Sequence, residues 1–128
     1  MNIFVVGIGG FFGSCCRYLL TRFCQQQGAE FPFGTLLSNV IAALLIGLII
    51  GVEREAAPLS EQMRLFLTTG LLGGLSTFST FSIETVRFFE NGKLLLAGGN
   101  ILLNLALSLG FVFIGLRLAQ QFMIFIQR

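Results

Sequence analysis

The sequence is poor in charge and contains neither histidine nor tryptophan. Lys, Arg, Asp and Glu make up only 11% of the 128 residues, and the formal net charge is +2. A soluble domain is usually about one quarter charged, so this composition excludes a soluble enzyme or an appended soluble domain. The small, scattered positive charge also excludes a nucleic-acid-binding patch, and no nucleic acid is expected as a partner. Without histidine, the most frequent general base and metal ligand is missing.

Long uncharged stretches take the place of charge. Apolar residues make up 55% of the chain, and no charged residue occurs in residues 1–16, 31–52, 65–83 and 94–116. A transmembrane helix needs about 20 mostly apolar residues, so these stretches predict an all-α integral membrane protein surrounded by lipid. The prediction is a single four-span membrane domain over residues 1–128, with spans at about 3–23, 33–52, 61–90 and 94–122.

Pairs of glycines four residues apart predict close packing between two of these spans and their neighbours. Gly9 and Gly13 form such a pair in the first span, and Gly47 and Gly51 form another in the second. Small residues at this spacing let two helix backbones approach closely in lipid.

The third span differs from the others. Residues 61–72 are expected to form an ordinary helix, but Gly73 and Gly74 follow, and Ser and Thr then recur between residues 76 and 82. Paired glycines, and hydroxyl side chains that bond to nearby backbone, are poor formers of continuous helix. The sequence therefore predicts a helix that is broken mid-membrane, near residues 73–77, and then resumes to Glu90. An unbroken helix with a glycine-rich packing face is the alternative.

The fourth span carries its polar residues on one stripe, since Asn100, Asn104 and Ser108 are spaced four residues apart. Four-residue steps advance only about 40° around a helix, so the three side chains share one face. Polar side chains are rare against lipid, which predicts that the stripe faces either another helix or a water-filled path.

The positive charges assign no orientation to the protein in the membrane. Four spans put both termini on one side, so each side carries four positive charges: Arg54, Arg64, Arg117 and Arg128 on one, and Arg17, Arg22, Arg87 and Lys93 on the other. Orientation follows an excess of Lys and Arg on the cytoplasmic side, and here there is none. Insertion in both orientations, followed by pairing, would give an antiparallel dual-topology homodimer.

Two functional classes fit this composition poorly. An enzyme is not expected, because Glu84 is the one acid within a span apart from Glu61 and Glu90 at its two limits, and no catalytic partner lies beside it in the sequence. A small proton-coupled multidrug or cation exporter, working as a dual-topology dimer, would need an acid deep in a span. Glu84 lies near a helix end, and Tyr18 is the one aromatic residue besides the phenylalanines. This exporter is the alternative function.

The remaining class is a passive path for a small anion. Neutral hydrogen-bond donors recur in the spans: Asn39, Thr77, Thr80, Asn100, Asn104 and Ser108. Phe78 and Phe81 lie three residues apart beside these donors, and phenyl edges carry partial positive charge. Donors and ring edges together could replace the water around a small anion. A pore Lys or Arg would bind it too tightly for release.

Three segments resemble the Fluc (CrcB) family of fluoride channels. They are GGFFGSCCRY at residues 9–18, GTLLSN at residues 34–39 and GGLSTFSTFS at residues 73–82 followed by Glu84. The segments fall in order in three different spans, and the resemblance covers essentially the whole chain. It implies a dual-topology antiparallel homodimer with two pores that passively exports toxic fluoride across the inner (plasma) membrane of a microbe.

The resemblance also implies roles for individual residues. Phe78 and Phe81 would line the fluoride path with their ring edges, and Asn39 would donate to the ion. The polar track would be formed or flanked by Thr77, Thr80, Glu84, Asn104 and Ser108. Backbone carbonyls of Gly73 and Ser76 would hold a structural Na⁺ at the dimer two-fold axis. Arg17 would either shape the aqueous entrance or extend from a helix end toward the membrane surface.

Overall fold

The computed structural model describes residues 1–127, and all of its regular elements are helices. Arg128, which the charge count includes, lies outside the described residues. In chain order the elements are α1 (Asn2–Gln25), α2 (Phe33–Glu55), α3 (Glu61–Arg64), the π-helix η1 (Leu65–Leu72), α4 (Gly73–Leu75), α5 (Phe78–Glu90) and α6 (Leu94–Ile126).

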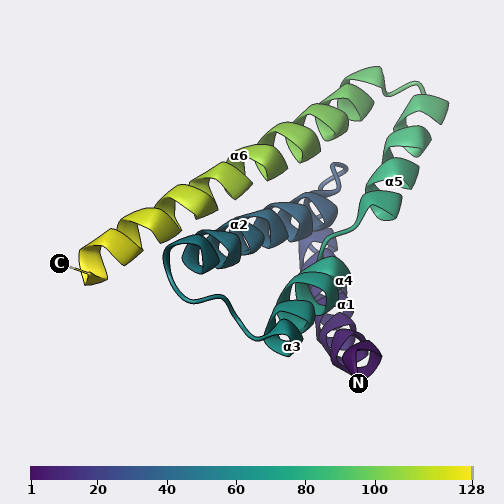
Figure 1. Ribbon diagram of the computed structural model, residues 1–128. Coiled ribbons are helices and arrows are strands. Elements are labelled where there is room, and N and C mark those ends of the chain that lie inside the picture. The colour runs from purple at the N-terminus through teal and green to yellow at the C-terminus, as the bar shows by residue number, and fades with distance from the viewer. Residues whose placement is uncertain (128) are drawn as a thin grey trace.

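Four helical stretches are long and apolar enough to cross a membrane: Asn2–Gln25, Phe33–Glu55, Glu61–Glu90 and Leu94–Ile126. They confirm the predicted all-helical class with four potential spans. In Figure 1 the longest helix, α6, runs beside α2, while α3 and α4 lie next to α1. The elements of the third stretch thus divide between two neighbours, because α5 packs on α6 whereas η1 and α4 pack on α1.

Glycines allow the two main helix contacts, which are those between α2 and α6 and between α1 and η1. A Cβ added to Gly47 would collide with the backbone oxygen of Val112, and one added to Gly115 would collide with that of Leu44. The backbones of α2 and α6 therefore touch where α2 carries the predicted glycine pair. Gly13 of α1 lies equally close to the backbone oxygen of Leu71. Only glycine permits such approaches, as the small-residue spacing predicts.

The outside of the chain is apolar and much of its interior is polar. Large apolar side chains on the long helices are widely exposed, for example Leu95 at 89% and Phe4 at 74%. The largest fully buried side chains are instead Asn100, Thr35 and Ser38. A soluble protein shows the reverse distribution. In lipid this distribution is favourable, because apolar side chains face hydrocarbon and polar groups bond to one another.

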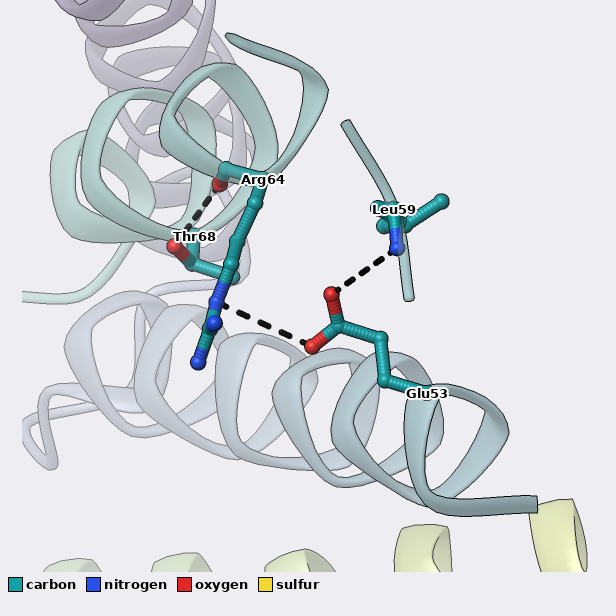
Figure 2. A network of polar contacts seen from close by, with 4 residues as sticks. All are labelled: Glu53, Leu59, Arg64 and Thr68. Carbon is teal, nitrogen blue, oxygen red and sulfur yellow. Dashed lines mark hydrogen bonds and ion pairs between the residues drawn. The ribbon is translucent and has the colours of Figure 1, made fainter. Parts of the chain in front are cut away.

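Polar contacts fix the entry into the third stretch (Figure 2). Glu53, near the end of α2, accepts the backbone N–H of Leu59 at 3.3 Å and forms an ion pair with Arg64 at 3.7 Å. The Thr68 hydroxyl then donates to the Arg64 carbonyl at 2.8 Å. These contacts tie the loop to α2 and join the end of α2 directly to α3.

The helical hydrogen bonding of the third stretch changes twice. Residues 65–72 form a π-helix, so the expectation of an ordinary helix over residues 61–72 was wrong for most of that range. α4 then ends at Leu75, and α5 begins at Phe78. Ser76 and Thr77 between them have extended backbone, with ψ values of 154° and 122°. Thr77 caps α5, because its hydroxyl accepts the N–H of Thr80 at 3.3 Å.

Candidate functional site

A pocket of about 410 Å³ opens where α2, α6 and the extended residues between α4 and α5 meet. Eight residues that the sequence analysis selected line it: Asn39, Gly73, Ser76, Thr77, Phe78, Phe81, Asn104 and Ser108. The other lining residues are Ala42, Ala43, Ile46, Thr68, Leu72 and Leu105, so no charged side chain contributes to the wall. The pocket therefore offers amide, hydroxyl and phenyl groups without a fixed charge.

The two phenylalanines lie together on the first turn of α5. Their ring centroids are 5.4 Å apart, and the ring planes are inclined by 56°. Phe81 is buried at 7% exposure, whereas Phe78 is 73% exposed in the single chain. One ring is therefore fixed by its surroundings and the other projects from the surface of the subunit.

Asn39 replaces hydrogen bonds that the extended backbone loses. Its Oδ1 accepts the N–H of Thr77 at 2.7 Å, and its Nδ2 donates to the Thr77 carbonyl at 3.2 Å. The same Nδ2 donates to Oδ1 of Asn104 at 2.9 Å. In this structure both amide hydrogens of Asn39 have protein acceptors, so an ion that approaches Asn39 has to displace one of them.

Further polar residues continue from Asn104 along α6 and back to α5. Asn104 Nδ2 donates to Oδ1 of Asn100 at 2.9 Å, and Asn100 Nδ2 donates to the hydroxyl of Thr85 at 2.9 Å. The sequence analysis placed Asn100 on the stripe but did not select Thr85. Thr85 follows Phe81 by one helical turn on the same face, which is the signal that could have found it.

Glu84 and Thr80, which the resemblance places in or beside the polar track, do not line the pocket. Oε1 of Glu84 accepts the hydroxyl of the buried Thr35 at 2.7 Å. Within the described residues, Glu84 Oε2 and the hydroxyl of Ser38 are buried without a hydrogen-bond partner. Thr80 belongs to the cap of α5, since its hydroxyl accepts from Thr77 Oγ1 at 3.0 Å.

Arg17 is separate from these groups. It lies half-buried on α1, more than two turns before the end of that helix, and does not line the pocket. The entrance role of Arg17 therefore stays a prediction.

The carbonyls of Gly73 and Ser76 have lost their usual helical donors. In a continuous helix Gly73 would accept the N–H of Thr77, but that N–H binds Asn39. Ser76 would accept the N–H of Thr80, which instead binds the Thr77 hydroxyl. Both carbonyl oxygens are therefore free to bind a hard cation such as Na⁺. Residues 1–127 contain no cluster of three His, Cys, Asp or Glu side chains that could hold a metal ion.

Comparison with known families assigns most of the chain to one family. Residues 4–116 match the CrcB-like protein family, Camphor Resistance (CrcB). The chain belongs to the CrcB family. Its matched range includes every residue that lines the pocket.

Curated CrcB relatives cover nearly the same length as this chain. A protein of Clostridium perfringens is 50% identical over 117 residues, which is 91% of each chain. One of Clostridium novyi is 44% identical over 112 residues, 87% of this chain and 88% of the relative. One of Ruminiclostridium cellulolyticum is 40% identical over 121 residues, 94% and 93% of the two chains. All three relatives are named fluoride-specific ion channel FluC.

Proposed function

We propose that this chain forms a fluoride-selective channel that lets fluoride leave the cytoplasm passively and so relieves fluoride toxicity. The observation that carries this proposal is the uncharged pocket, in which two phenyl rings and several N–H and O–H groups meet. Its relatives are named fluoride-specific ion channels, which agrees with a small anion as the permeant species. No enzymatic step is part of the proposal.

The chemistry of the wall accounts for passage rather than tight binding. A fluoride ion that leaves water must exchange its hydration shell for donors on the protein. The hydroxyl of Ser108, an amide hydrogen of Asn39 and the positive edges of Phe78 and Phe81 are neutral replacements. Because the wall carries no Lys or Arg, the ion is not trapped. The absence of a carboxylate from the wall avoids repulsion.

A cation exporter is less compatible with these contacts. It would need an acid that reaches the cavity to exchange protons for the cation. Glu84 does not line the pocket, and one of its oxygens is bonded to Thr35. Glu84 and Thr80 are proposed instead to flank the fluoride path beyond the pocket.

We propose further that two copies pair as an antiparallel dual-topology homodimer with two pores in the microbial plasma membrane. The pocket opens on the surface of a single subunit, and the 73% exposed Phe78 projects there. A second copy would complete the wall. Ser76 and Thr77 lie at the middle of the Glu61–Glu90 stretch, which favours a helix break at mid-membrane depth, where protein must surround irregular backbone.

Cysteine labelling tests the antiparallel arrangement. In a variant without Cys15, Cys16 and Cys24, a single cysteine is introduced in the loop between α2 and α3, for example Ala57→Cys. We expect a membrane-impermeant maleimide to label about half of the protein in intact cells and the rest only after permeabilisation. Labelling of all copies from one face would contradict dual topology.

The free carbonyls of Gly73 and Ser76 support a structural Na⁺ between the two subunits. Carbonyl oxygens suit this hard cation, and its positive charge would favour an anion nearby. Pairing around a two-fold axis would supply four such oxygens from two chains. Dimer melting temperature in Na⁺ compared with N-methylglucamine buffer tests the ion, and equal values would argue against it.

Ion release from proteoliposomes tests the function itself. Vesicles loaded with fluoride, or with chloride as the control, carry a K⁺ gradient, and valinomycin starts the efflux. We expect rapid fluoride release and little chloride release. A folded, dimeric protein that releases no fluoride would contradict the proposed channel.

A further inference from the structure

Two of the most buried polar side chains of the described residues do not line the pocket. Asn100 is 0% exposed and Thr85 is 6% exposed, and neither contributes to the pocket wall. Burial of polar groups is unfavourable unless they are hydrogen-bonded, and these two are bonded to each other at 2.9 Å. Asn100 and Thr85 therefore form a buried polar contact behind the pocket wall.

The bonds around Asn100 connect both ends of the first turn of α5. At one end, the Thr85 hydroxyl donates to the carbonyl of Phe81 at 2.8 Å. At the other end, Asn104 accepts from Asn39, which binds the backbone of Thr77 through both its N–H and its carbonyl. Asn100 joins these two groups of bonds, because it is hydrogen-bonded both to Thr85 and to Asn104.

Backbone groups at both ends fix the direction of every hydrogen bond in this series of side chains. The N–H of Thr77 can only donate, so Oδ1 of Asn39 must face it and Nδ2 must face Asn104. The Nδ2 of Asn104 then donates to the carbonyl of Asn100 at 3.0 Å as well as to its Oδ1. The Nδ2 of Asn100 is left to face Thr85, whose own hydrogen goes to the backbone. One orientation of each amide satisfies the whole series.

The turn held in this way carries both aromatic rings. Phe78 and Phe81 lie between the two anchored positions, Thr77 and the Phe81 carbonyl. α5 packs mainly on α6 and touches α2 at few points, so these hydrogen bonds help to set the position of its first turn relative to α2. A shift of the turn would move both ring edges relative to the pocket.

We propose that Asn100 is a positioning residue for fluoride conduction, which fixes the two phenyl rings through Thr85 on one side and through Asn104 and Asn39 on the other. The proposal rests on the proposed channel function. Asn100 itself does not touch the ion. It acts by fixing the positions of the two ring edges relative to the amide of Asn39. This role goes beyond a structural contact that only joins α5 to α6.

Two variants and their combination test this role in fluoride-loaded and chloride-loaded vesicles. Asn100→Leu keeps the size of the side chain but removes its hydrogen bonds, and Thr85→Val removes one hydroxyl with little change in shape. We expect each to lower fluoride release about tenfold per dimer and to lower the preference for fluoride over chloride. The double variant should be no slower than Asn100→Leu, because both changes break the same connection.

Ser82→Ala is the matched control. The Ser82 hydroxyl donates to the carbonyl of Phe78 at 2.8 Å, the same one-turn bond that Thr85 makes, but Ser82 is only half-buried and outside the series. It should conduct like the parent. If Asn100→Leu does not form a dimer, the comparison of Thr85→Val with Ser82→Ala decides the proposal.

The outcomes separate the two proposals. Parent protein without fluoride release would overturn the channel function and this inference with it. An active parent with unchanged release and selectivity in Asn100→Leu would overturn the inference alone. Slower release with parental selectivity, or effects of the two changes that multiply, would also overturn it, because a purely structural contact would give that result.

Discussion

Replacing Phe81 by isoleucine is expected to reduce fluoride release at least about tenfold while the protein still folds and pairs. Isoleucine fills much of the same buried space but has no aromatic edge to offer an anion. Phe81 also contacts Phe78, with centroids 5.4 Å apart, so its loss leaves the exposed ring without its neighbour. Edge contacts of aromatic rings contribute about 1 kcal/mol each, and here both rings are affected.

The same substitution at Phe89 provides the control for Phe81→Ile. Phe89 lies on the same helix, but it is 49% exposed and does not line the pocket. Release should be measured in the vesicle assay, with dimer content determined by gel filtration for each variant. Parental release from Phe81→Ile would remove the phenyl edge from the mechanism. Equal losses in both variants would assign the effect to general destabilisation.

The four spans could be predicted because lipid imposes a simple rule on the sequence. A segment of about 20 residues without charge has few stable alternatives to a membrane helix, so the pattern of charges alone located all four. The close approach of α2 and α6 could also be anticipated, since Gly47 and Gly51 have the spacing for it. These features depend on the local sequence and on the solvent.

The π-helical segment was not predicted from the sequence. Residues 65–72 contain no residue that by itself favours a wider helix. Gly70 and Gly74, however, are pressed against the backbone of Val6 and Gly10 in α1. That contact joins segments about 60 residues apart, so no local pattern in the sequence reveals it.

The candidate site was partly predictable for a related reason. Phe78, Phe81 and Ser108 stand out in the sequence by their chemistry and spacing, and the structure brings them to one pocket. Their roles in conduction stay predictions. The pairing of Asn100 with Thr85 and of Thr35 with Glu84 joins different helices, so the relative rotation of the helices decides it. No periodicity within one helix contains that information.

Replacing Asn39 by aspartate is expected to have the largest effect on conduction. The carboxylate would place a negative charge beside the ion path. Two like charges about 4 Å apart repel by about 4 kcal/mol at the effective dielectric constant of partly exposed protein sites. This repulsion alone corresponds to a reduction of about a thousandfold in fluoride release. Aspartate would also lose both amide donors, which bind the Thr77 carbonyl and Asn104.

Two further variants separate charge from structure in that result. Asn91→Asp adds the same charge at an exposed position outside the pocket and should conduct like the parent. Asn39→Leu removes the donors without adding charge, so it should retain more fluoride release than Asn39→Asp if repulsion dominates. Equal loss in the two Asn39 variants would mean that the contact with Thr77 matters more than the charge. Unchanged release in Asn39→Asp would place Asn39 outside the ion path.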